Sequence, residues 1–179
     1  MSKQILVISA SPRKGGNSDT LADAFIRGAR EGGNEVEKVA LCGKKLEFCR
    51  GCLTCVKTQR CVIQDDADAI VRKMLTADVL VFATPIYYYG MCGQMKTMLD
   101  RSNPLYSADY AFRDVYLLAT AAEEEPHTVD GTVTGLQGWV DCFEKARLAG
   151  TVFAGGVTAV GEIQGHPALK QAYDMGKNA

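Results

Sequence analysis

Short strand-like segments, most of them continuous apolar runs, alternate with segments of helical periodicity, and this alternation restricts the fold more than any other feature of the chain. Apolar runs of this length, bounded by turn-forming residues, are typical of buried strands. They predict strands at 4–8, 78–84, 114–120 and 150–157, and an alternating pattern predicts a more exposed strand at 35–41. Helical spacing predicts helices that start at Asn17 or Ser18 and at Asp65 or Asp66, and further helices at 90–101, about 134–147 and 167–176.

Strands separated by helices pair in parallel and form a sheet that is covered on both faces. For five strands the usual arrangement is the doubly wound order 2-1-3-4-5, with a ligand at the carboxyl ends of the strands. We therefore predict an α/β three-layer sandwich with a five-stranded parallel sheet in that order. A length of 179 residues suits a single domain, 1–179, with a cysteine-rich excursion at 42–63 that fits neither pattern.

Charge and hydropathy narrow the range of partners. The chain has 20 Lys and Arg against 21 Asp and Glu, a net charge of −1, so it lacks the basic field that would favour nucleic acid or an anionic membrane. Its longest apolar stretch, 79–89, is shorter than the roughly 18 residues of a membrane span. Its first residues turn polar too soon for a signal peptide. We expect a cytoplasmic protein with no nucleic-acid or membrane partner.

A loop rich in hydrogen-bond donors follows the first predicted strand and leads into a helix. Serine hydroxyls, an amide and two cations there, with the free N–H groups of the helix, favour binding of a phosphate group. The loop has neither the G-x-x-x-x-G-K-[ST] pattern nor the G-x-G-x-x-G pattern, which argues against an ATPase or a dinucleotide-binding dehydrogenase. The alternative is a solvated strand–helix turn. The candidate residues are Ser9, Ser11, Arg13, Lys14, Asn17 and Ser18.

Three consecutive tyrosines lie in the segment 84–90, which is predicted to be a loop after the third strand. A flat aromatic ligand could stack on such side chains at the carboxyl edge of a central strand. The alternative is that the tyrosines cover the sheet edge or contact another subunit.

Together these motifs resemble the NADPH-dependent FMN reductase branch of the flavodoxin-like superfamily. The resemblance extends over the whole chain and is clearest in Ser9-Ala10-Ser11-Pro12-Arg13 with Asn17-Ser18, in Pro85-Ile86-Tyr87-Tyr88, and in Gln94-Met95-Lys96 through Asp100-Arg101. It implies a flavodoxin-like fold, non-covalently bound FMN, NAD(P)H as co-substrate, and a homodimer or homotetramer. It also implies that the donor-rich loop binds the FMN phosphate. The ring would lie against Pro85, Ile86, Tyr87, Tyr88, Tyr89, Gly90, Thr120, Ala121 and Ala122.

Four cysteines in the excursion follow the pattern C-x2-C-x2-C-x5-C, at Cys49, Cys52, Cys55 and Cys61. Thiolates at this spacing suit a [4Fe–4S] cluster or, less well, zinc. Five Lys and Arg residues nearby would offset the charge of a cluster or lower thiol pKa values. The motif resembles that of the iron–sulfur flavoproteins, in which a [4Fe–4S] cluster lies close to FMN. The alternative is free or reversibly oxidised thiols. The remaining three cysteines, Cys42, Cys92 and Cys142, are expected to be lone buried residues.

The expected function is that of an FMN-dependent NAD(P)H oxidoreductase that passes electrons to a flavin, a quinone, or a nitro or azo compound. No catalytic side chain is expected, because the flavin carries the chemistry. Two alternatives remain: an iron–sulfur electron carrier for a ferredoxin-like partner, and a non-enzymatic module with a structural or redox-sensing cysteine loop. His127 is either part of a solvated acidic loop or a proton donor on a lid, and His166 is expected at the entry of the last helix.

Overall fold

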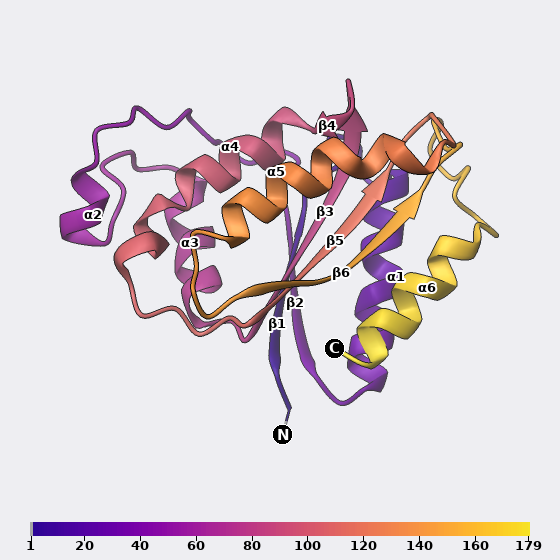
Figure 1. The fold of residues 1–179 in the computed structure, drawn as a ribbon, viewed down its shortest axis with the longest axis horizontal. Coiled ribbons are helices and arrows are strands. Elements are labelled where there is room, and N and C mark those ends of the chain that lie inside the picture. Colours follow the sequence, from indigo (N-terminus) through magenta and orange to yellow (C-terminus); the bar gives the residue numbers. More distant parts are fainter. Residues whose placement is uncertain (1) are drawn as a thin grey trace.

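The computed structural model describes residues 2–179; Met1, the first residue of the predicted domain, lies outside them. A parallel sheet forms the middle layer, in the order β2-β1-β3-β5-β6 (Figure 1). Its strands are β1 (Gln4–Ser9), β2 (Glu35–Ala40), β3 (Val79–Tyr87), β5 (Asp114–Thr120) and β6 (Arg147–Ala154). The two-residue strand β4 (Gly90–Met91) pairs antiparallel with the end of β3. Without β4, the order is the predicted 2-1-3-4-5, which confirms the flavodoxin-like fold class.

Helices cover both faces of this sheet (Figure 1). Helices α1 (Asn17–Glu31) and α6 (Pro167–Lys177) pack on one face. Helices α3 (Asp66–Thr76), α4 (Gly93–Arg101) and α5 (Asp130–Val140) pack on the other. The short elements α2 (Thr54–Thr58), η1 (Asn103–Ser107) and η2 (Pro126–Val129) lie in connections. The three layers explain why the inner strands read as continuous apolar runs, because both of their faces are buried.

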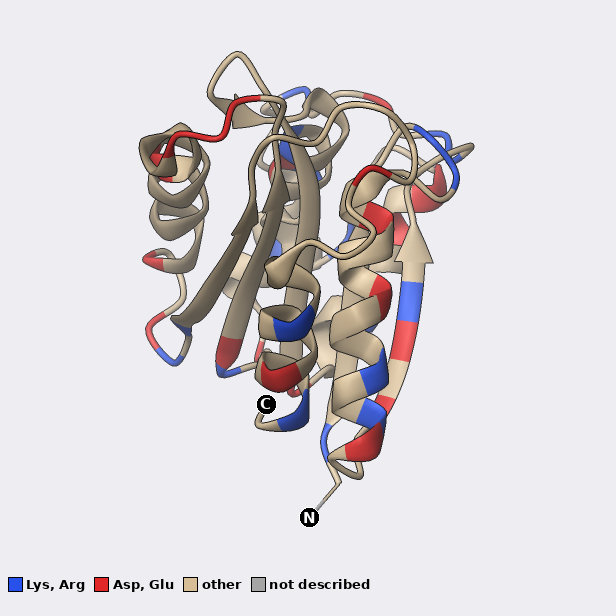
Figure 2. Ribbon diagram, turned by 90° about the vertical axis from the view of Figure 1, so that its right-hand side faces the viewer, with Lys and Arg blue, Asp and Glu red and all other residues tan. Residues whose placement is uncertain are grey.

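The alternation of side chains along β1 shows how one run feeds two cores. Ile5 and Val7 pack under α1 and α6, whereas Leu6 and Ile8 pack under α3, α4 and α5. Successive strand residues point to opposite faces, so an unbroken apolar run is needed to fill both layers. Charge is correspondingly displaced outward: the edge strand β2 and the helices α1 and α6 carry charged positions, while the inner strands are almost free of them (Figure 2).

Four predicted elements differ from the structure by three or more residues at one end or both. The strand predicted at 78–84 is Val79–Tyr87. The helix predicted at 90–101 begins at Gly93, because Gly90 and Met91 pair with β3. The helix predicted near 134–147 is Asp130–Val140, and the strand predicted at 150–157 is Arg147–Ala154. Strand β6 is at the edge of the sheet and half exposed, so its register is set by pairing with β5 rather than by a continuous apolar run.

Helices α1 and α6 cross closely. A Cβ on Gly28 would lie 1.9 Å from the carbonyl oxygen of Tyr173, and one on Gly176 would lie 2.1 Å from that of Phe25. The two glycines therefore allow backbone contact between the helices. No helix in the described part of the chain is long and apolar enough to span a membrane.

Candidate functional site

Strands β1, β3 and β5 end at the same edge of the sheet, where the donor-rich loop and the tyrosine segment meet. The amide of Ala10 donates to the carbonyl of Ala83 at 2.8 Å, and Pro85 pairs with Thr120. Parallel strands bring their carboxyl ends together, so residues far apart in sequence become neighbours. The predicted site residues outside the cysteine-rich excursion lie at this edge.

The donor-rich loop buries four of its polar residues, Ser9, Ser11, Asn17 and Ser18, each at most 5% exposed. Helix α1 begins after Gly16, whose extended backbone provides the cap position without a side-chain hydrogen bond. The prediction that Asn17 or Ser18 caps this helix is therefore wrong. The Asn17 amide is engaged elsewhere: Nδ2 donates to the Ala159 carbonyl at 2.9 Å, and Oδ1 accepts from the Ile163 amide at 3.4 Å.

Ser9, Ser11 and Arg13 also make side-chain contacts within the protein. Ser9 Oγ donates to Asp19 Oδ1 at 2.7 Å, and Ser11 Oγ donates to the Arg13 carbonyl at 2.7 Å. Arg13 and Lys14 are exposed, and Arg13 Nη2 donates to the Thr158 carbonyl at 2.8 Å. The loop thus combines buried hydroxyls, exposed cations and an uncapped helix start, which is the donor set a phosphate needs.

The loop's tight path depends on two glycines. Gly15 has φ +66°, a conformation that favours glycine. A Cβ on Gly16 would lie 2.5 Å from Ser11 Oγ, so only a residue without a side chain lets the helix start approach this hydroxyl.

Asp19 and Lys38 form an ion pair beside the loop that the sequence analysis missed. Asp19 Oδ1 lies 2.7 Å from Lys38 Nζ, which also lies 2.7 Å from Asp23 Oδ1. Burial opposes ionisation of Asp19, but hydrogen bonds from Lys38 and Ser9 prevail and lower its pKa. Burial likewise opposes the charge on Lys38, yet its two carboxylate partners raise its pKa.

The tyrosine segment is a hairpin, not the loop that the sequence predicts. Strand β3 continues to Tyr87, and Tyr88 and Tyr89 make the turn into β4 with φ +48° and +62°. Left-handed backbone in two consecutive tyrosines is sparsely populated and costs of order 1–3 kcal/mol per residue. Tyr88 is fully exposed. Such strain persists only where the surrounding structure imposes it, which marks this hairpin as a functional candidate.

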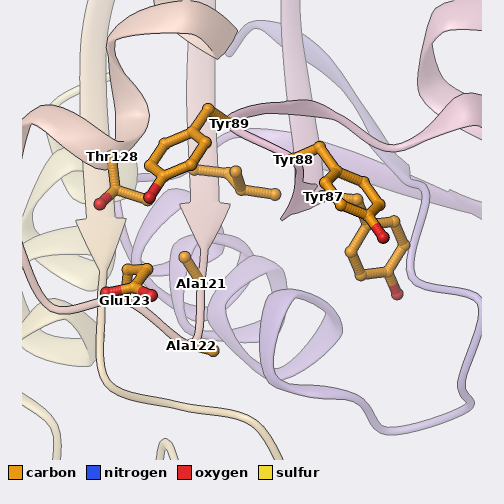
Figure 3. A pocket seen from close by; sticks show the side chains of 8 residues that line it. Tyr87, Tyr88, Tyr89, Ala121, Ala122, Glu123 and Thr128 are labelled. Atoms are coloured by element: carbon orange, nitrogen blue, oxygen red, sulfur yellow. The ribbon is translucent and has the colours of Figure 1, made fainter.

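A cavity of about 290 Å³ opens below the hairpin (Figure 3). The Tyr89 ring lies on the side of Thr128 and Glu123, while the rings of Tyr87 and Tyr88 lie together on the other side (Figure 3). Pro85 and Thr120 are buried in the paired strands, and Gly90 belongs to β4. The cavity is lined by Ile86, Tyr87, Tyr88, Tyr89, Ala121, Ala122, Glu123 and Thr128.

The two histidines lie in different settings. His127 in η2 is exposed, and its Nδ1 lies 3.1 Å from Asp130 Oδ2. His166 stands at the start of α6, where its Nδ1 accepts from the Ala168 amide at 3.1 Å, as expected of a helix-entry residue.

The four motif cysteines lie in the excursion around α2. Cys55 is buried and accepts a hydrogen bond from Asn103 Nδ2 at 3.0 Å, Cys61 is half-buried, and Cys49 and Cys52 are exposed. Hydrogen bonds from the Thr54 amide and hydroxyl lower the pKa of the Cys52 thiol. Within residues 2–179, no three His, Cys, Asp or Glu side chains are grouped closely enough to hold a metal ion. Thiolates are the right ligand type for an iron–sulfur cluster, but this conformation does not gather them.

The remaining cysteines depart in part from expectation. Cys92 is buried, and its sulfur lies 3.4 Å from the Ala10 carbonyl oxygen. Cys42 and Cys142 are exposed, so their expected burial is wrong. Both lie at the ends of elements, where a local apolar pattern does not report burial.

Arg101 anchors both ends of the cysteine-rich excursion. Its side chain is fully buried, and Nη1 donates to the Glu47 carbonyl and to Asp65 Oδ2, both at 2.7 Å. Nη2 donates to the Ile63 carbonyl at 3.2 Å and to Asp65 Oδ1 at 2.9 Å. Asp65 also caps α3 by accepting from Ala67, which confirms the predicted cap. A charged residue three positions after buried Met98 is the sequence signal that could have shown this anchor.

A family model described as NADPH-dependent FMN reductase matches residues 4–134. An iron–sulfur flavoprotein of Archaeoglobus fulgidus is 41% identical over 97 residues, which are 54% of this chain. The match covers 44% of that relative, so the chain spans about half its length. An iron–sulfur flavoprotein of Methanosarcina thermophila is 28% identical over 173 residues, 96% of this chain and 87% of the relative.

Among solved structures, an NAD(P)H:quinone oxidoreductase from Methanothermobacter marburgensis superposes with a TM-score of 0.73 at 17% identity. The superposition covers 99% of this chain and 97% of that one. At this identity the likeness establishes the shared fold alone.

Proposed function

The chain belongs to the NADPH-dependent FMN reductase family, and from this membership we propose that it is an FMN-dependent oxidoreductase that takes electrons from NAD(P)H. FMN, when bound, supplies the hydride and electron transfer, and the protein supplies binding, orientation and exclusion of water. The observation that carries the proposal is the meeting, at one sheet edge, of a buried donor-rich loop with an aromatic-walled cavity.

The loop after β1 would hold the FMN phosphate. Ser9, Ser11 and Ser18 are buried hydroxyls, and the amides at the start of α1 carry the positive end of the helix dipole. Arg13 and Lys14 supply exposed positive charge. In the described conformation Asn17 ties the loop to residues 159 and 163, so we propose that it acts mainly by positioning.

The cavity below the hairpin would hold the ring. Tyr89 supplies an aromatic wall, and the small side chains of Ala121 and Ala122 leave room opposite it. Pro85, Gly90 and Thr120 shape this wall from the strands behind it. An open, mostly apolar cavity favours a small flat acceptor, so we propose a flavin, a quinone, or a nitro or azo compound.

An iron–sulfur electron carrier is the second candidate. The four-cysteine motif, the five basic residues around it and the curated relatives called iron–sulfur flavoproteins favour it. Cys49, Cys52, Cys55 and Cys61 would be the ligands of a [4Fe–4S] cluster, and a ferredoxin-like protein the partner. Because the described conformation does not gather these sulfurs, the third candidate, a structural or redox-sensing thiol loop, also stays open to test.

Assembly and location are further proposals. The fully exposed Tyr88 at the hairpin tip suits a contact with a second subunit, so we propose a homodimer or homotetramer. As a separate proposal, the protein is located in the cytoplasm.

The first experiment is an absorption spectrum of the anaerobically purified chain, with iron and acid-labile sulfide measured on the same sample. The proposal requires bound FMN and oxidation of NADH or NADPH when a quinone is added. About four irons per chain, the content of a [4Fe–4S] cluster, would support the electron-carrier candidate. Flavin without iron would support the reductase alone. Absence of flavin after addition of excess FMN would refute both and leave the thiol loop.

A further inference from the structure

A carboxylate lies beside the predicted phosphate site, although its negative charge would repel a bound phosphate. Asp19 is in the first turn of α1, and its Oδ1 accepts from the Ser9 hydroxyl at 2.7 Å. Its Oδ2 accepts from the Gly15 amide at 3.3 Å. Ser9 ends β1 and Gly15 comes just before the helix, so one carboxylate holds both ends of the donor-rich loop.

This arrangement has an electrostatic cost, because a carboxylate beside the loop repels a bound phosphate. Lys38 compensates the negative charge of Asp19, because its Nζ lies 2.7 Å from Asp19 Oδ1. Strand β2 places Lys38 there: it pairs with β1, and Lys38 is opposite Val7 in the register. The side chains of Asp19 and Lys38 are only 15% and 23% exposed, so solvent screens their interaction less than that of a surface pair.

We propose that Asp19 and Lys38 are positioning residues of the FMN phosphate site. Asp19 holds the Ser9 hydroxyl and the Gly15 amide in place, and Lys38 cancels the negative charge that this role brings to the loop. The inference rests on the proposed function, because it concerns the same site. The lowered pKa of Asp19 and the raised pKa of Lys38 agree with both groups being charged at neutral pH.

The test is a cycle of charge-changing variants. Lys38→Gln leaves the Asp19 carboxylate without its partner, so FMN binding weakens by at least about 10-fold, equivalent to about 1.4 kcal/mol. Asp19→Asn/Lys38→Gln removes the repelling charge as well, so FMN affinity returns to within about 2-fold of that of Asp19→Asn, the scatter of independent changes. Lys38→Arg, which keeps the charge, binds FMN more tightly than Lys38→Gln.

Asp23→Asn is the matched control. Asp23 is the other carboxylate that contacts Lys38, but it is half exposed and lies one helical turn farther from the loop. Its loss leaves the Asp19–Lys38 pair intact, so FMN affinity stays within about 2-fold of the unsubstituted chain.

Binding is measured by fluorescence titration of the deflavinated full chain with FMN and with riboflavin, which lacks the phosphate. A phosphate-site effect weakens FMN binding and leaves riboflavin binding unchanged. Equal losses for both ligands, or a double variant that binds FMN clearly more weakly than Asp19→Asn, would overturn the inference. An unsubstituted chain that binds riboflavin no worse than FMN would also overturn it. If the unsubstituted chain binds neither, the proposed function itself fails.

Discussion

Replacing Arg101 by Met tests how the cysteine-rich excursion is held to the domain. The substitution keeps most of the aliphatic volume but removes the donors to the Glu47 and Ile63 carbonyls and to both oxygens of Asp65. Both charged side chains are 0% exposed, so Asp65 would be left as a buried carboxylate without its counter-charge.

The expected loss follows from that burial. Removing one partner of a buried ion pair costs about 3–5 kcal/mol, a large part of the roughly 5–15 kcal/mol by which a domain is stable. At about 2–4 °C per kcal/mol for a chain of this size, the melting temperature should fall by about 6–20 °C. Lys96→Met is the control: Lys96 pairs with Asp100 on the same helix, but both are exposed, so the expected change is at most about 1 kcal/mol.

The assay is thermal and urea unfolding at pH 7, with Arg101→Met/Asp65→Asn measured alongside. The double variant should recover part of the loss, because the uncompensated charge is gone and Asn still caps a helix. A fall of less than about 2 °C for Arg101→Met would refute the anchoring role, as it corresponds to at most about 1 kcal/mol.

The pH dependence of the stability loss tests the same ion pair. Burial opposes ionisation of Asp65, but hydrogen bonds from Arg101, Glu47 and Ala67 prevail and lower its pKa below 3.8. A lowered folded-state pKa gives stability that is present above the unfolded value and is lost as the pH falls through the folded value. In Arg101→Met, burial without the guanidinium raises the pKa of Asp65. Protonation of Asp65 therefore removes the uncompensated buried charge and reduces the destabilisation of the variant. The difference between the two chains should shrink as the pH falls from 7 to about 4, and a constant difference would contradict this account.

Three further outcomes are expected. Gly28→Ala should destabilise the chain by about 1–3 kcal/mol or more in urea unfolding, because its methyl group would meet a carbonyl of α6. The control is Gly138→Ala in α5, where an added Cβ meets no atom of the described residues within 4 Å apart from its chain neighbours and the backbone of its own helix. This variant should be neutral or stabilising by up to about 1 kcal/mol. Ser11→Ala/Arg13→Ala should strip FMN on gel filtration, since each charge-assisted bond contributes about 1.5–3 kcal/mol, and unchanged flavin content would contradict the assigned loop. Cys52→Ser should abolish any iron in a metal assay but leave FMN bound; loss of FMN with iron retained would contradict two separate sites.

Local sequence patterns predicted much of the fold. The apolar runs of β1 and β5 predicted these strands to within one residue, because a strand buried on both faces needs an unbroken apolar run. The Asp65 cap could also be predicted from the sequence, because a capping carboxylate accepts a hydrogen bond from an amide two residues away. The edge strand β6 was misplaced by three residues at both ends, because its half-exposed pattern has no such signature.

Only part of the candidate site could be predicted from the sequence. Serines and cations after β1 indicated a phosphate loop, and three tyrosines indicated an aromatic site, because donor chemistry and turn position are local properties. The hairpin that forms where a loop was predicted depends on Gly90 and Met91 pairing with β3, and that pairing has no distinctive local pattern.

The sequence by itself determined which segments are strands and helices, their order in the sheet, and which residue types gather at its carboxyl edge. The tertiary structure alone decided the partners of the buried polar groups: Asn17 with residues 159 and 163, Asp19 with Lys38, and Arg101 with Asp65. The reason is physical. Periodicity records which side chains are buried, whereas a buried charge must find its counter-charge on whichever distant segment the packing brings within about 3 Å.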